Sequence, residues 1–193
     1  MNAPTTAPGP GGPRQRARHQ VERALRRGRF LVRSAVEPAL RGEPLAVGPR
    51  TRLTIGPAGS FRRGPRCTIA GDFTGDFQGE VVWGEDVFVN VGAYVSIRES
   101  LVVGDRCRFG ERVSIHDEDH VFEPLGADRS QYVTSPVVIE DDVWIGAGAI
   151  VLRGAHVGAG SVIAAGAVVR GEVPPGSLVA GVPGRVVRPL RSA

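Results

Sequence analysis

The chain has 193 residues, which suits one domain, and its formal net charge of +4 is unevenly distributed. Residues 1–66 contain fourteen Arg and three Glu, a net charge of +11, whereas residues 67–193 carry a net charge of −7. No apolar run is long enough for a membrane-spanning helix, and we expect no secretory leader at the N-terminus. The two cysteines, Cys67 and Cys107, have neither CxxC nor metal-ligand spacing, so a reduced, cytoplasmic protein is expected.

The N-terminal segment is basic. Residues 1–18 are rich in Pro, Gly, Ala and Thr, which predicts a disordered tail. Residues 19–45 are predicted to form two parts: an amphipathic helix over residues 19–37, which Pro38 ends, and a linker. Two interpretations of the helix are open: it caps the open end of a following solenoid, which we favour, or it makes peripheral contact with a membrane. No nucleic-acid partner is expected.

Residues 138–173 carry the clearest pattern in the chain. An aliphatic residue stands at every sixth position, and a small residue or Val stands four positions after it. A fixed six-residue period is typical of a parallel β-helix, in which each hexapeptide forms one short strand and one turn. Glycines suit the turns, and three strands form a triangular coil of about 18 residues. The aliphatic positions are Ile139, Ile145, Val151, Val157, Ile163 and Val169.

The same repeat, less regular, extends toward the N-terminus, so we predict a β-helix domain over residues 46–193. Residues 46–80 are expected to form degenerate coils. The step from Val95 to Val103 is eight residues instead of six, which predicts a two-residue insertion near residues 98–100. Cys107 occupies a small-residue slot and is expected to pack in the interior.

The register stops at Ile115 and resumes at Ile139. The intervening excursion loop, residues 116–137, has Pro, charged residues and two His in place of the repeat. A long excursion from a regular solenoid is where function is expected. The two histidines, His116 and His120, are therefore candidate site residues.

Three blocks of this sequence resemble the hexapeptide-repeat acyltransferases, in particular the galactoside and maltose O-acetyltransferases and relatives that acetylate sugars of bacterial surface polysaccharides. The resemblance covers roughly residues 80–190. It implies a left-handed parallel β-helix, a homotrimer with active sites between neighbouring subunits, acetyl-CoA as co-substrate and a sugar or glycan as acceptor. The blocks are VGDRCRFGERVSIHDEDH, VVIEDDVWIGAGAIVLRGAHVGAGSVIAAGAVV and VPPGSLVAGVPGRVVR.

Moving an acetyl group from a thioester to an alcohol requires a base for the hydroxyl proton and donors for the oxyanion. Imidazole titrates near neutral pH and suits the first task. The resemblance places His120 at the position of the family's catalytic His. The residues leave open whether Asp117, Glu118, Asp119 or a main-chain carbonyl orients its ring. We assign His116 and Asp119 to the acceptor side.

Asn90 is the second candidate catalytic residue. It stands in EDVFVNVGAYVSI, where the family has an Asn that holds the acceptor hydroxyl or the reacting acyl group. A neutral amide offers donors and an acceptor without adding charge near the base. Of the remaining histidines, His19 lies in the basic N-terminal segment, and His156 is predicted at a solvent-facing turn.

The resemblance also implies residues that bind the acyl donor. Small residues would let the pantetheine arm approach main-chain groups, and guanidinium groups suit the phosphates. One position departs from the family, since Arg170-Gly171 replaces the usual Thr-Lys before the two prolines. The predicted donor-binding residues are Trp144, Ala147, Ala165, Arg170, Arg185 and Arg188.

Other functions are compatible with a solenoid of this kind. The nearest alternative is an N-acetyltransferase acting on an amino sugar, because an amine acceptor needs the same base. A non-catalytic β-helix scaffold is a second alternative. A zinc-dependent carbonic anhydrase is disfavoured, because His116 and His120 lack a well-placed third His, and no metal is expected.

Overall fold

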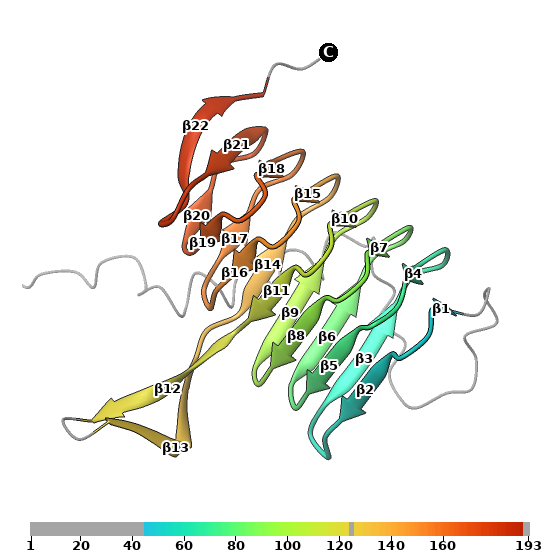
Figure 1. Cartoon of the computed structure of the whole chain (residues 1–193), viewed down its shortest axis with the longest axis vertical. Coiled ribbons are helices and arrows are strands. Elements are labelled where there is room, and N and C mark those ends of the chain that lie inside the picture. The colour runs from blue at the N-terminus through green and yellow to red at the C-terminus, as the bar shows by residue number, and fades with distance from the viewer. Residues whose placement is uncertain (1–44, 124–125, 191–193) are drawn as a thin grey trace, which may run out of the picture. The chain divides into compact units, whose positions relative to one another are not determined.

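The computed structural model describes residues 45–123 and 126–190, so the predicted tail and the predicted N-terminal helix lie outside the described residues. In this part of the chain, three parallel sheets surround a common core, and an antiparallel hairpin projects from the stacked coils (Figure 1). None of its helices is long and apolar enough to cross a membrane. The predicted all-β class, a parallel β-helix of hexapeptide repeats with a protruding loop, is confirmed.

Successive strands enter the three sheets in turn. Sheet A, in spatial order, is β1 (Ala46–Val47), β4 (Thr68–Ile69), β7 (Phe88–Val89), β10 (Arg108–Phe109), β15 (Trp144–Ile145), β18 (Val162–Ile163), β21 (Ser177–Ala180) and β22 (Arg185–Pro189). Sheet B is β2 (Arg52–Ile55), β5 (Thr74–Phe77), β8 (Tyr94–Ile97), β11 (Ser114–His116), β16 (Ile150–Val151) and β19 (Val168–Val169). Sheet C is β3 (Ser60–Arg63), β6 (Glu80–Trp83), β9 (Ser100–Val103), β14 (Val137–Ile139), β17 (His156–Val157) and β20 (Glu172–Val173). The hairpin consists of β12 (Glu118–Glu123) and β13 (Gly126–Thr134).

The aliphatic residues of the six-residue repeat form the core. Members of the repeat enter sheets C, A and B in rotation, and all six are at most 2% exposed. In sheet A, Ile145 pairs in register with Phe109 below it and Ile163 above it, so buried side chains stack from coil to coil. Burial of each such side chain contributes about 1.5–3 kcal/mol, which makes these stacks the main stabilising element of the solenoid.

The corners of the coils explain why the repeat is less regular toward the N-terminus. A residue with positive φ is needed at each tight corner, and Gly148 and Gly166 supply it in later coils with φ of 66° and 69°. In earlier coils the same conformation is adopted by Arg50 and Asp72, with φ of 56° and 49°. Their side chains form a bidentate pair, with N–O distances of 2.5 and 2.7 Å, across successive coils. These earlier corners therefore have the same backbone conformation without a glycine at the position of positive φ.

Two corners of the coils carry most of the predicted site residues. The A–B edge comprises the connections from sheet A to sheet B, including residues 90–93, 110–113, 146–149 and 164–167. The B–C edge comprises the connections from sheet B to sheet C, including residues 98–99, 152–155 and 170–171 and the hairpin. The predicted two-residue insertion is confirmed by the strand register: Val95 and Val103, eight residues apart, align through Ile115 and Ile139 with Val151 and Val157, which are six residues apart. Cys107 is buried in the core, as predicted.

Candidate active site

The hairpin leaves the solenoid directly after His116 and returns before Val137. Its strands pair Asp119 with Val133 and His120 with Tyr132, and the register shifts immediately after His120. The returning end is tied to the coils, since the main-chain N–H of Ser135 donates to the carbonyl of Asp117 at 2.9 Å and Gly154 donates to Ser135 at 3.1 Å. His120 therefore lies on the stem of the hairpin, near the B–C edge, and not at its tip.

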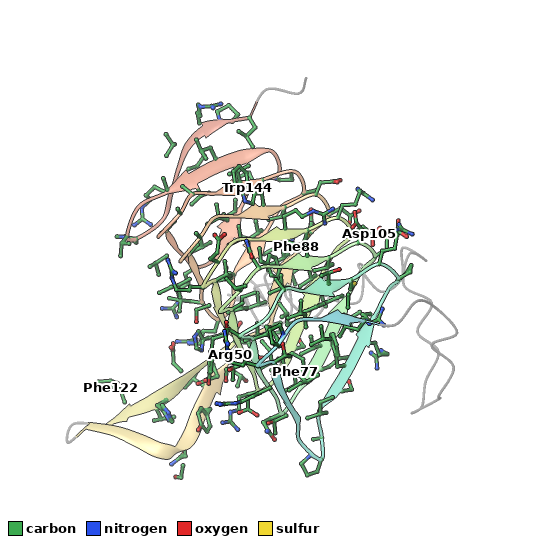
Figure 2. All side chains as sticks on the ribbon, turned by 45° about the vertical axis from the view of Figure 1, so that its right-hand side comes forward. Arg50, Phe77, Phe88, Asp105, Phe122 and Trp144 are labelled. Atoms are coloured by element: carbon green, nitrogen blue, oxygen red, sulfur yellow. The ribbon has the colours of Figure 1, made fainter. Side chains whose placement is uncertain are left out.

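His120 is an exposed residue of the stem, and its imidazole lies beside an aromatic ring. The ring centroids of His120 and Tyr132 are 4.5 Å apart, with an interplanar angle of 35°. The guanidinium carbon of Arg98 lies 4.3 Å from the Tyr132 centroid, and Arg98 Nη2 donates to the phenol oxygen at 3.3 Å. Farther along the hairpin, Phe122 is 87% exposed and projects from β12 (Figure 2). The sequence did not indicate Tyr132 or Arg98 as site residues.

Asp117 anchors the base of the hairpin. Its side chain is fully buried and accepts the main-chain N–H groups of Arg98, Glu99 and Ser100 at 2.6–2.8 Å. Burial raises the pKa of Asp117 to about 6, against the opposing effect of the three donors. This carboxylate fixes the turn between β8 and β9 below the hairpin, so its role in the described structure is to hold that turn.

The other predicted loop residues also have protein partners. Asp119 forms an ion pair with Arg153 of the coil above, and Glu118 Oε1 accepts the hydroxyl of Ser96 at 3.3 Å. His116 is half-buried on β11, where its Nε2 lies 2.8 Å from Ser114 Oγ and its ring lies 5.5 Å from that of Tyr94. His116 thus lies at the C-terminal end of β11, an interior strand of sheet B, and His120 lies on the hairpin stem that follows it.

Asn90 follows β7 on the A–B edge. Its Nδ2 donates to Glu111 Oε1 of the next coil at 2.8 Å, and its Oδ1 accepts the main-chain N–H of Val91 at 2.9 Å. Both ends of the amide are therefore oriented by the solenoid itself. Glu111 was not singled out from the sequence, because only the stacking of coils brings it beside Asn90.

The two small residues predicted to bind the acyl donor, Ala147 and Ala165, lie on this same A–B edge. The main-chain N–H of Arg112 donates to Val91, that of Gly148 to Glu111, and that of Gly166 to Ala147, at 2.7–2.9 Å. These bonds stack the turns that contain Asn90, Glu111, Ala147 and Ala165 in successive coils. Trp144 precedes this edge on β15, where it is 57% exposed on the outer side of sheet A (Figure 2).

The predicted phosphate-binding arginines fall in two places. Arg185 and Arg188 are exposed on β22, which pairs antiparallel with β21 at the end of sheet A. Arg170 is exposed on the B–C edge, between β19 and β20. Within one chain, the structure thus separates Arg170 from the A–B edge that carries Ala147 and Ala165.

The prediction for His156 is wrong. It is a strand residue of β17, and its side chain is only 16% exposed. Its Nε2 lies 2.9 Å from Glu140 Oε1, and its Nδ1 lies 2.9 Å from Glu172 Oε2. His156, Glu140 and Glu172 meet on the outer side of sheet C because successive coils stack there. The position of His156 in the six-residue repeat does not reveal this stacking contact. No group of three His, Cys, Asp or Glu residues in the described ranges has metal-site geometry.

The sequence comparisons identify the family. The family model "Bacterial transferase hexapeptide (six repeats)" matches residues 136–171. Nodulation protein L of Rhizobium meliloti is 34% identical over 166 residues, covering 79% of this chain and 91% of that protein. The galactoside O-acetyltransferase of Lactococcus lactis is 32% identical over 131 residues, covering 67% of this chain and 63% of that protein.

A solved structure has the same fold. It is the hexapeptide-repeat acetyltransferase of Vibrio cholerae in complex with acetyl-CoA, with a TM-score of 0.53, 24% identity and coverage of 93% of this chain and 88% of that chain. This likeness extends over the solenoid as a whole, whereas the family model covers its most regular coils. On the near full-length match to Nodulation protein L and the repeat itself, the chain belongs to the hexapeptide-repeat acetyltransferases.

Proposed function

We propose that the protein transfers an acetyl group from acetyl-CoA to a hydroxyl of a sugar or glycan, with His120 as the general base. The observation that carries the proposal is an exposed imidazole on a braced hairpin stem, in a solenoid whose A–B edge combines Asn90 with the small residues Ala147 and Ala165. The name of the Lactococcus relative supports a sugar hydroxyl as acceptor, and the ligand of the Vibrio structure supports acetyl-CoA as donor.

In this mechanism the imidazole of His120 accepts the proton of the acceptor hydroxyl while the hydroxyl oxygen bonds to the thioester carbonyl carbon. The carbon–sulfur bond then breaks, and the imidazolium returns the proton to the departing thiolate. The products are an acetyl ester and the thiol of CoA. General-base assistance of this kind typically contributes about 10²–10⁴-fold in rate.

Asn90 acts in this proposal as a donor. Its Oδ1 already accepts from Val91, and one Nδ2 hydrogen is directed to Glu111. The second Nδ2 hydrogen has no partner in residues 45–123 and 126–190, which leaves it to stabilise negative charge on the thioester carbonyl oxygen. Trp144 would lie beside the pantetheine arm, and Arg185 and Arg188 would contact the phosphates.

The two halves of the site lie on different edges of one chain. His120 is at the B–C edge beside Arg98, whereas Asn90, Ala147 and Ala165 are at the A–B edge. We therefore place the reacting groups between two copies of the chain in a ring of three, with His120 of one copy facing the A–B edge of the next. Mixed rings of His120→Ala and Asn90→Ala subunits test this arrangement.

If the site is shared, roughly a quarter of the interfaces in a randomly mixed ring carry both intact residues, so the mixture regains activity that neither variant has alone. Activity of the mixture equal to the average of the two pure variants would place both residues in one chain. Light scattering on the mixed and unmixed samples establishes the size of the assembly in each case.

The His120→Ala variant tests the base. Thiol release from acetyl-CoA, measured against a panel of glycans, should fall by about 10²–10⁴-fold, while calorimetry should show unchanged CoA binding. His156→Gln, on the outer side of sheet C, is the matched control and should retain turnover. Undiminished turnover by His120→Ala would refute the assignment.

The chemistry of the product distinguishes an ester from an amide. A sugar O-acetyl ester is removed by mild alkali, whereas an N-acetyl amide survives the same treatment. Mass analysis of the product before and after alkali should show loss of the acetyl group. Retention of the acetyl group would instead establish transfer to an amine of an amino sugar.

A further inference from the structure

Tyr132 is held against the His120 ring by contacts from outside the hairpin. Across the stem, Tyr132 pairs in register with His120, and their ring centroids are 4.5 Å apart. Arg98, from the turn between β8 and β9, places its guanidinium carbon 4.3 Å from the Tyr132 centroid and donates to the phenol oxygen at 3.3 Å. The hairpin thus contacts the preceding coil through a cation and an aromatic ring.

Arg98 is itself fixed by the coil. Its main-chain N–H donates to Asp117 Oδ1 at 2.8 Å, and its Nη2 lies 4.0 Å from Asp76 Oδ2. Its Nε is buried and has no hydrogen-bond partner in the described residues. An unpaired buried N–H is unfavourable, and the contact of the guanidinium with the Tyr132 ring offsets part of that cost.

We infer that Tyr132 is a positioning residue for His120, and that Arg98 holds it in that position. The inference rests on the proposed function, in which His120 is the base. A histidine on an exposed strand can rotate about two side-chain bonds, and a neighbouring ring at stacking distance restricts that rotation. The fixed turn at residues 98–100 thereby contributes, through Arg98 and Tyr132, to the orientation of the imidazole, and neither residue has to contact substrate for this role.

Four full-length variants test the inference. Tyr132→Leu removes the ring, Tyr132→Phe keeps the ring without its hydroxyl, and Arg98→Met removes the cation. The chain has only two tyrosines and four histidines, and the second tyrosine, Tyr94, lies beside His116 instead of His120. Tyr94→Leu is therefore a matched control for the spectroscopic measurement.

The first measurement is the NMR shift of the histidine ring protons, with the His120 signals assigned from their absence in His120→Gln. The Tyr132 ring should shift these signals upfield, so they should move in Tyr132→Leu, stay nearly unchanged in Tyr132→Phe, and not respond to Tyr94→Leu. Identical His120 signals in wild type and Tyr132→Leu would overturn the inference.

The second measurement separates kcat from KM. Tyr132→Leu and Arg98→Met should lower kcat by about tenfold, with an unchanged KM for acetyl-CoA, because orientation of the base is lost and donor binding is not. Tyr132→Phe should restore most of the kcat. A wild-type kcat in Tyr132→Leu would also overturn the inference.

A separate result would refute the proposed function, namely full activity of His120→Ala. The NMR shifts do not depend on activity and report only the contact between the rings of His120 and Tyr132. Thermal unfolding of each variant identifies loss of folding. If Arg98→Met fails to fold, Arg98→Lys keeps a cation but lacks the planar guanidinium group, and it should lower kcat less than Tyr132→Leu does.

Discussion

The side-chain amide of Asn90 donates to the carboxylate of Glu111 one coil further along the A–B edge, at 2.8 Å. Because Oδ1 also accepts the N–H of Val91, the two contacts fix the direction of the second Nδ2 hydrogen, which has no partner among the described residues. Glu111 is held in turn, because its main-chain carbonyl accepts from Gly148 at 2.7 Å. Two neighbouring coils therefore orient one candidate catalytic side chain.

Changing Glu111 to Ala should lower kcat by about tenfold without altering acetyl-CoA binding, because the Asn90 amide loses its second fixed partner. Glu111→Gln is the control, since its side-chain carbonyl can still accept the same hydrogen bond. Initial-rate kinetics on both variants measure the effect. Equal activities of the Ala and Gln variants would show that the contact does not orient Asn90.

Replacement of Asp117 by Asn should lower the free energy of unfolding by about 1–3 kcal/mol at pH 7, because the new amide presents N–H groups to main-chain N–H donors. Urea unfolding of the variant and the wild type measures the loss. The expected position of the damage is the turn at residues 98–100, which the Asp117 carboxylate holds.

The same pair of proteins should also differ in the pH dependence of stability. The folded-state pKa of Asp117 is raised to about 6 by burial, above the ordinary value of 3.8. Between these values the folded state binds more protons than the unfolded state, so this group stabilises the fold as pH falls from 7 toward 4. The stability gap between wild type and Asp117→Asn should widen over that range by up to about 3 kcal/mol. A gap that narrows on acidification would contradict the raised pKa.

The sequence predicts the later coils well because their repeat uses the residues that the geometry favours. Gly148 and Gly166 stand where φ is positive, and Ile145 and Ile163 stack in register. The earlier coils are harder to predict. Arg50 and Asp72 occupy equivalent corners with a bidentate ion pair, which depends on contact between coils and leaves no periodic glycine signal.

The candidate site also has residues that the sequence predicts and residues that only the fold shows. His120 and Asn90 could be proposed from the excursion loop and the family resemblance, because each stands in a recognisable local motif. Tyr132 and Arg98 could not, since the hairpin register and the stacking of coils bring them together. The residues that orient a side chain come from distant parts of the chain, and only the fold shows them.

Both cysteines should react slowly in the folded protein. Burial raises the pKa of the Cys107 thiol to about 12, and burial also raises that of Cys67; the two side chains are at most 2% exposed. The thiolate is the reactive form, so an aromatic disulfide reagent at pH 8 should label both thiols only after unfolding in urea. Rapid labelling of the native protein would contradict the burial. The expected result also allows the same reagent to monitor CoA release.

Two glycines of the A–B edge offer a matched test of its packing. At Gly146, an added Cβ would lie 2.6 Å from the main-chain N of Ala165 and 2.9 Å from the carbonyl oxygen of Ile163, so the neighbouring coil must shift. At Gly166, no atom lies within 4 Å of an added Cβ, and only the φ of 69° opposes substitution. Gly166→Ala should therefore cost about 1 kcal/mol of stability, and Gly146→Ala more, on the order of 3 kcal/mol. Urea unfolding of the two variants measures the difference, and equal losses would show that the coils at this edge are less closely stacked than the structure indicates.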